Sequence, residues 1–103
     1  MKEKSSEQLY HALCAKLRGV YPLADDGFIS RTADRIMRCD LSLRANIREW
    51  AAGRPLSDKY YRGKYTLRMA SVLCGGDVVR AMIALDEYIR DAGMEELIWL
   101  RKK

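Results

Sequence analysis

The chain has 103 residues, and its 19 Lys and Arg exceed its 14 Asp and Glu, so the formal net charge is +5. Its length allows one small domain, and a hydrophobic fraction of 49% is typical of a globular chain rather than a disordered one. The longest stretch without a charged residue, 69–76, is too short to cross a membrane, and the charged first residues argue against a secretory signal. We therefore expect a single domain over residues 1–103, located in the cytoplasm and away from membranes.

Apolar residues recur at helical spacing along the whole chain, and no segment shows the alternating pattern of a strand. This periodicity predicts an all-α fold, a compact bundle of five to six short helices. The expected helices cover residues 5–18, 30–39, 42–53, 64–74 and 77–92, with a last short helix from residue 94.

The first predicted helix begins at Ser5 or Ser6, because Ser5 and Gln8 have the spacing of a capping box. Its core stripe is Leu9, Leu13, Leu17 and Val20. Residues 22–27 then form a predicted turn in which Gly27 is free to take a positive φ. Ser30 is the expected N-cap of the second helix.

The second predicted helix carries a row of arginines. At 100° per residue, Arg31, Arg35 and Arg38 lie on the side opposite its apolar residues. The apolar residues of this helix are Ala33, Ile36 and Met37. The arginine row is therefore expected to face solvent.

The third predicted helix repeats this plan between an N-cap at Ser42 and an end at Gly53. Arg44 and Arg48 are one turn apart, beside a core stripe of Leu43, Ile47 and Trp50. The order of the second and third helices is compatible with a helix-turn-helix, with Arg44 and Arg48 facing a DNA groove. Two features count against that arrangement. The connection at Asp40 and Leu41 lacks a turn glycine, and Asn46 stands where an apolar residue is expected.

The fourth predicted helix, 64–74, is apolar almost all round, which is typical of a helix at the centre of a fold. A glycine pair at 75–76 breaks it, and Asp77 caps the fifth helix. The core stripe of the fifth helix is Val78, Met82, Leu85 and Ile89. Its acidic residues Asp86 and Glu87 are expected on the outer surface.

The positive charge is concentrated in the middle of the chain. Residues 31–68 contain ten basic and four acidic residues, a balance of +6, whereas the other 65 positions hold nine basic and ten acidic residues. Arg35 and Arg48 have no acidic residue three or four positions away, so helical neighbours do not neutralise them. Within this range, residues 59–65 contain three of the basic residues, interleaved with three tyrosines.

Cysteine and histidine positions do not indicate an enzyme. Cys14, Cys39 and Cys74 have neither disulfide-framework nor zinc-site spacing, so we expect free thiols and no metal or cofactor. His11 lies three residues before Cys14, but no third group completes a catalytic set. The glycine pair at 75–76 lacks the Lys and Ser/Thr of a phosphate-binding loop. We therefore expect a non-enzymatic binding module.

Lys and Arg neutralise phosphates, and tyrosine can stack on bases, so the basic segment predicts sequence-tolerant binding to DNA or RNA. The predicted binding residues are Arg31, Arg35, Arg38, Arg44, Arg48, Arg54, Lys59, Tyr60, Tyr61, Arg62 and Lys64. The alternative is a protein-interaction module, such as a small inhibitor or adaptor that docks on an acidic surface of a larger protein, including a protein that handles nucleic acid. Either a monomer or a homodimer is compatible with the sequence.

Overall fold

The computed structural model describes residues 2–56 and 66–91, and this part of the chain is all-α, without a strand. It contains α1 (Lys2–Val20), α2 (Asp26–Met37), a 3-10 turn (Leu41–Leu43), α3 (Arg44–Ala51), α4 (Leu67–Leu73) and α5 (Val78–Arg90). The predicted fold class is confirmed. The short helix expected from Met94 lies outside the described residues.

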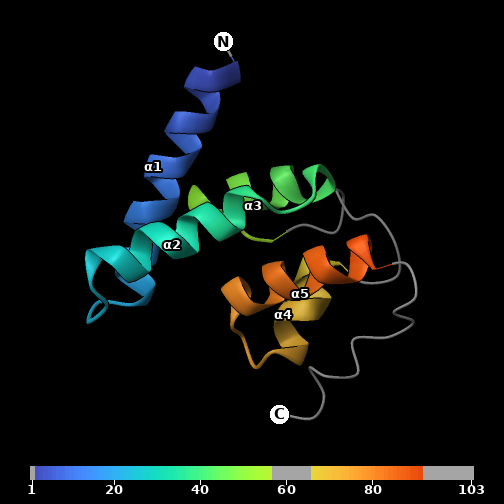
Figure 1. Ribbon diagram of the computed structural model, residues 1–103. Coiled ribbons are helices and arrows are strands. Elements are labelled where there is room, and N and C mark those ends of the chain that lie inside the picture. Colours follow the sequence, from blue (N-terminus) through green and yellow to red (C-terminus); the bar gives the residue numbers. More distant parts are fainter. Residues whose placement is uncertain (1, 57–65, 92–103) are drawn as a thin grey trace.

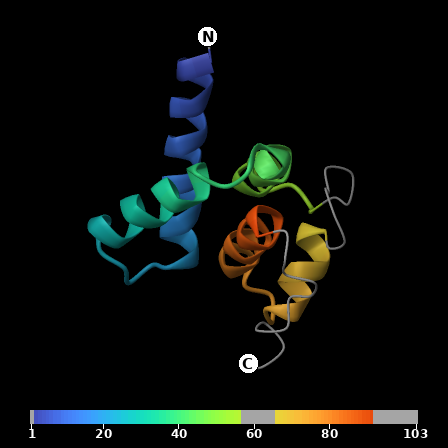
Figure 2. The ribbon, with the colours of Figure 1, turned by 45° about the vertical axis from the view of Figure 1, so that its right-hand side comes forward.

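The helices pack in two groups that meet at α2. α1 packs against α2 and α3, while α5 packs against α2 and α4 (Figure 1). Figure 2 shows the same arrangement after rotation, with α4 beside α5 and α1 on the other side of the molecule. Because α2 has a neighbour on each side, only its remaining face is open to solvent.

The core confirms most of the predicted apolar stripes. The buried residues of those stripes are Leu9, Leu13, Leu17, Ala33, Ile36, Leu43, Ile47, Trp50, Met82 and Leu85. Val20, predicted as the last core residue of α1, is 45% exposed, because the helix ends there and the chain turns toward α2. Asn46 is fully buried among these side chains, at the position where the sequence suggested an apolar residue.

Aspartates, rather than the predicted serines, start the second and third helical segments. Asp25 accepts a hydrogen bond from the Phe28 backbone N–H at 2.7 Å, so α2 begins four residues before the expected N-cap Ser30. Gly27 therefore lies in the first turn of α2, and it is not among the described glycines with positive φ. A carboxylate is as good an N-cap as a serine hydroxyl, and Asp25 comes first along the chain.

The third segment follows the same rule. Asp40 accepts a hydrogen bond from the Ser42 backbone N–H at 3.0 Å and starts the 3-10 turn. Ser42, the predicted N-cap, instead has a buried hydroxyl without a hydrogen-bond partner. α1 also begins at Lys2 rather than at Ser5 or Ser6.

Two predicted helix ends are confirmed. Asp77 caps α5 by accepting from the Arg80 backbone N–H at 3.0 Å. Gly53 follows α3 with a φ of 78°, a backbone conformation that glycine adopts at little cost.

α4 is not surrounded by the described residues, which corrects the prediction of a central helix. Leu67 and Ala70 are buried, but Met69 and Val72 are 48% and 73% exposed. One side of α4 packs against α5, and its other side is an apolar surface.

α2 and α3 follow one another closely in sequence, as a helix-turn-helix requires. The main packing partner of α3 is nevertheless α1, and α2 packs mainly against α1 and α5. The described packing thus adds no support to a helix-turn-helix reading.

Candidate anion-binding surface

The structure describes six of the eleven predicted binding residues. Arg31 and Arg35 lie on α2 and Arg38 is its C-cap, whereas Arg44 and Arg48 lie on α3 and Arg54 follows α3. Lys59, Tyr60, Tyr61, Arg62 and Lys64 lie outside the described residues. The surface is therefore built here from the arginines of α2 and α3.

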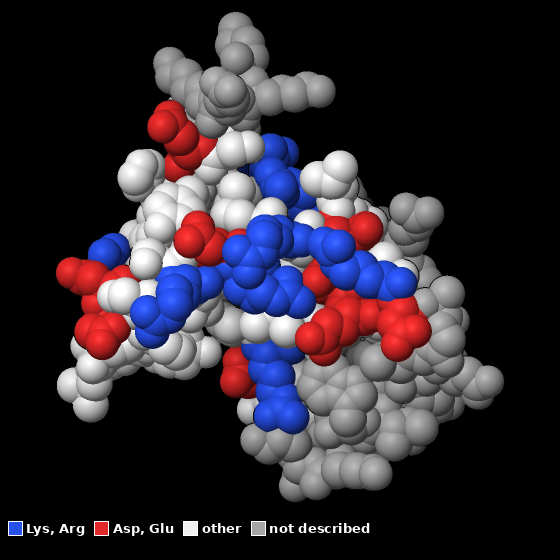
Figure 3. Space-filling model, viewed as in Figure 1, with Lys and Arg blue, Asp and Glu red and all other residues white. Residues whose placement is uncertain are grey.

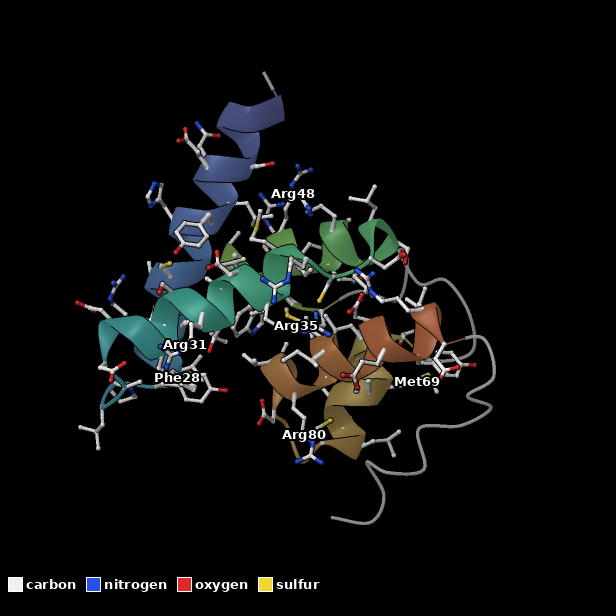
Figure 4. All side chains as sticks on the ribbon, viewed as in Figure 1. Phe28, Arg31, Arg35, Arg48, Met69 and Arg80 are labelled. Carbon is white, nitrogen blue, oxygen red and sulfur yellow. The ribbon has the colours of Figure 1, made fainter. Side chains whose placement is uncertain are left out.

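The arginine row of α2 is on the open side of the helix, opposite the buried Ala33 and Ile36. Arg31 and Arg38 are exposed, and Arg35 between them is half-buried. Figure 4 shows Arg31 and Arg35 following one another along α2. The predicted face is correct, but its members differ in how freely they reach solvent.

Gly27 leaves room for the Arg31 side chain. A Cβ atom at Gly27 would lie 3.0 Å from Nη1 of Arg31, and 3.4 Å from Oδ1 of Asp25. The Arg31 guanidinium therefore lies back over the first turn of α2, on the same side of Gly27 as the carboxylate of Asp25.

Arg35 is bound to a carboxylate on another helix. Its Nη2 lies 2.9 Å from Oδ2 of Asp86, whose side chain is only 1% exposed. Asp86 also accepts from Nε of Arg90 and from the backbone N–H of Asp40, each at 2.7 Å. A buried carboxylate with three donors is well compensated, and it ties α2, the following loop and α5 together.

Arg90 extends this cluster to the end of α2. Its Nη2 donates to the carbonyl oxygen of Arg38, and the hydrogen bond and charge of Asp86 raise the pKa of Arg90. Arg90 is thus a basic residue of the same surface that the sequence did not indicate.

One expectation about this cluster holds only within α2, and another was wrong. Arg35 has no acidic residue three or four positions away in the sequence, but Asp86, 51 residues away, pairs with it. Asp86 is buried rather than on the outer surface of α5. The sequence held a signal for this, because residue 86 is four positions after Met82 and seven after Val79, on the side of α5 that enters the core.

Cys39 lies beside the same cluster. Its Sγ is 3.8 Å from the carbonyl oxygens of Arg35 and Met82. Burial, reinforced by the negative charge of Asp86, raises the pKa of the Cys39 thiol to about 11. Cys39 is therefore a neutral thiol at physiological pH.

The arginines of α3 differ in exposure. Arg44 is half-buried, and its Nη2 lies 3.4 Å from the carbonyl oxygen of Met37 at the end of α2. Arg48 and Arg54 are exposed. On the neighbouring α1, Nζ of Lys16 lies 5.4 Å from the centroid of the Trp50 ring.

Figure 3 shows how these charges are distributed. A band of Lys and Arg side chains crosses the middle of the face, over α2 and toward α5, and acidic side chains lie on both sides of it. From the contacts above we define the arginine band as Arg31, Arg35, Arg38, Arg44 and Arg90. Its narrow shape suits a ligand that is itself a narrow line of negative charge.

Next to one end of the band is an apolar hollow. It has a volume of about 580 Å³, lies at the α1–α2 turn and is open to solvent. Leu23 in its wall is fully exposed and Phe28 is 39% exposed. Phe28 is three residues before Arg31 on α2, so the hollow and the band are neighbours.

The other candidate groups are placed as follows. His11 is exposed, whereas Cys14 is buried and forms a hydrogen bond that raises the pKa of Tyr10. Each of the three cysteines is a thiol outside any disulfide. Within residues 2–56 and 66–91, no three His, Cys, Asp or Glu side chains are grouped so that they could hold a metal ion.

The described helices and the comparisons with known proteins give two negative findings. None of the described helices combines the length and the apolar character needed to cross a bilayer. Comparison of the chain with protein-family models, with curated proteins and with solved structures gave no match.

Proposed function

We propose that this chain is a binding module for nucleic acid, and that phosphates bind along the arginine band. The observation that carries the proposal is the band of basic side chains itself (Figure 3). Two of its members, Arg31 on α2 and Arg38 at the end of α2, are exposed. Arginine suits this role because its planar guanidinium pairs with phosphate through two parallel hydrogen bonds.

The spacing of the exposed arginines supports a phosphate ligand. Arg31 and Arg38 are two helical turns apart, about 10 Å along the axis of α2. Four successive phosphates on one strand of duplex DNA rise by about the same distance. Acidic side chains beside the band would repel a wider polyanion, so a single phosphate backbone fits it best.

Arg35 and Arg90 have a different role in this proposal. Asp86 already compensates them, so they add less attraction for phosphate than Arg31 and Arg38. Their contribution is to hold the end of α2 in place.

The experiment is fluorescence anisotropy with labelled single-stranded and double-stranded DNA and RNA of mixed sequence. If about three phosphates are neutralised, affinity for duplex DNA falls roughly 40-fold between 50 and 200 mM salt. The double variant Arg31→Glu/Arg38→Glu should bind at least tenfold more weakly, because each substitution replaces an attraction by a repulsion.

The control is Arg68→Glu/Arg80→Glu, which makes the same change of charge on α4 and α5, away from the band. It should leave most of the affinity intact. Absence of binding at low salt, or equal losses in the two double variants, would exclude the arginine band as a nucleic-acid site.

One observation favours a protein partner as the second candidate. The apolar hollow beside Arg31 exposes Leu23 and Phe28, and a mixture of arginine with exposed apolar side chains is common at protein interfaces. In that case nucleic acid does not bind, and a stoichiometric protein is retained by the chain from nuclease-treated lysate. Its retention should then be lost in Leu23→Asp.

A further inference from the structure

The apolar hollow at the α1–α2 turn contains an exposed aromatic ring. Phe28 lies in its wall and is 39% exposed. The rings of Phe28 and Tyr21 meet edge to face, with their centroids 5.3 Å apart and an interplanar angle of 83°. Tyr21 therefore holds the Phe28 ring in one orientation, and the ring offers an apolar aromatic surface to a ligand.

This hollow adjoins the arginine band. Phe28 and Arg31 are about 5 Å apart along the axis of α2, and Figure 4 shows them at the same end of that helix. A Cβ atom at Gly27 would lie 3.0 Å from Nη1 of Arg31 and 3.4 Å from Oδ1 of Asp25, a residue of the hollow wall. The guanidinium and the hollow thus border the same glycine, so a ligand bound to Arg31 can place a second group in the hollow.

The charges around the hollow indicate which part of a nucleotide enters it. Asp25 is the one charged residue among the described residues of the wall, and its carboxylate repels a phosphate. The neighbouring Asp26 is paired with Arg18, whose Nη2 lies 3.4 Å from Oδ1 of Asp26. A base is uncharged, flat and aromatic, and adenine, guanine and cytosine carry amino groups that can donate to a carboxylate. The hollow therefore favours a base, whereas the arginine band favours a phosphate.

The size of the hollow fits this occupant. Its volume of about 580 Å³ is within the range of small-ligand pockets, and its opening to solvent leaves room for the rest of the strand. The bases of a duplex are stacked and paired inside the helix, so a protein can stack on a base only where that base is unpaired. The hollow is thus suited to a single strand rather than to a duplex.

We propose that this hollow receives an unpaired base of single-stranded nucleic acid, which stacks on Phe28 while an adjacent phosphate binds Arg31. The inference rests on the proposed function and adds to it the class of nucleic acid. Every base has an aromatic face, so a stacking site of this kind is tolerant of sequence.

Fluorescence anisotropy with a short labelled single strand of mixed sequence, and with the duplex of the same sequence, tests the stacking site. Phe28→Ala should weaken binding of the single strand roughly tenfold, because it removes one base–aromatic stack. It should leave the affinity for the duplex nearly unchanged. Phe28→Trp keeps an aromatic face and should retain most of the affinity for the single strand.

Salt dependence separates stacking from charge. Phe28→Ala should lower the affinity by the same factor at every salt concentration, because stacking releases no counterions. Arg31→Glu/Arg38→Glu should instead flatten the dependence of affinity on salt. A strand in which every nucleotide is abasic keeps the phosphates but has no base to stack, so it should bind the unsubstituted chain and Phe28→Ala equally well.

Met69→Ala is the matched control. Met69 is 48% exposed, similar to Phe28, but it lies on α4, so its truncation should leave binding of the single strand unchanged. If circular dichroism shows that Phe28→Ala unfolds the chain, Phe28→Leu provides a milder change. It keeps an apolar side chain without an aromatic face, and it should weaken binding of the single strand in the same direction.

The possible failures are distinguishable. Equal losses in Phe28→Ala and Met69→Ala, or equal losses for single strand and duplex, would overturn the stacking site. If Arg31→Glu/Arg38→Glu weakens binding and Phe28→Ala does not, the arginine band stands and the base site fails. If neither DNA nor RNA binds at low salt, both proposals fail, and a protein whose retention is lost in Leu23→Asp would be the occupant of the hollow.

Discussion

Nη2 of Arg35 on α2 and Oδ2 of Asp86 on α5 are joined at 2.9 Å, although 51 residues separate them in the sequence. This pair connects the two groups of helices, because α2 packs on α1 and α5 packs on α4. Asp86 is buried and accepts from two guanidinium groups and one backbone N–H. Its loss leaves these donors without their acceptor.

Asp86→Ala should therefore reduce the free energy of unfolding by about 3 kcal/mol, because breaking a buried ion pair leaves uncompensated charge. Urea titration followed by circular dichroism measures this loss. The neighbouring exposed residue provides the control, and Glu87→Ala should change stability by no more than about 0.5 kcal/mol. Equal effects of the two substitutions would mean that the cluster contributes little to stability.

Substitutions at Arg35 and Arg38 should have different effects, the first on the free energy of unfolding and the second on DNA affinity. Arg35→Ala removes a charged hydrogen bond to Asp86 and should cost about 1.5 kcal/mol of unfolding free energy. Arg38→Ala removes an exposed side chain and should leave stability nearly unchanged while weakening duplex DNA binding several-fold. Urea titration and anisotropy on both variants test this difference, and the reverse pattern would contradict the roles assigned to the two residues.

The start of α2 gives a test of the helix caps. Asp25→Ala should cost about 1 kcal/mol, because it removes the acceptor for the Phe28 backbone N–H. Ser30→Ala, at the N-cap expected from the sequence, should cost less than about 0.5 kcal/mol because Ser30 is inside the helix. Comparison of their urea midpoints decides which residue caps α2.

Cys39 should make the protein less stable in alkali. Its pKa rises from an ordinary value of 9.0 to about 11 in the folded chain. The unfolded thiol therefore loses its proton first, so the stability due to Cys39 is complete below pH 9 and is lost as pH rises toward 11. Cys39→Ala should flatten this part of the stability profile, and an unchanged profile would show that the thiol does not contribute.

The sequence predicted the features that depend on near neighbours. The core stripes of α1, α3 and α5 follow from helical spacing, and the open side of α2 follows from its arginines. The caps were harder, because Asp25 and Ser30 are both good N-caps and nothing in the local pattern decides between them.

The features that depend on distant neighbours were not predicted. Arg35 lacks a partner within its own helix, and its pairing with Asp86 depends on how α2 and α5 cross. The same packing buries Asp86 and brings Arg90 to the end of α2. Exposure of Met69 and Val72 is also a matter of packing, since the pattern of α4 indicates burial on every side.

A substitution at Gly27 can displace the Arg31 guanidinium without changing the net charge of the protein. Gly27→Ala would place a methyl group where Nη1 of Arg31 now approaches to 3.0 Å, and this long side chain can swing aside. The number of cations, and hence the long-range attraction for a polyanion, would stay the same. If the affinity for nucleic acid changes while its salt dependence stays the same, the ligand requires the Arg31 guanidinium at this position. An unchanged affinity would indicate general electrostatic attraction instead.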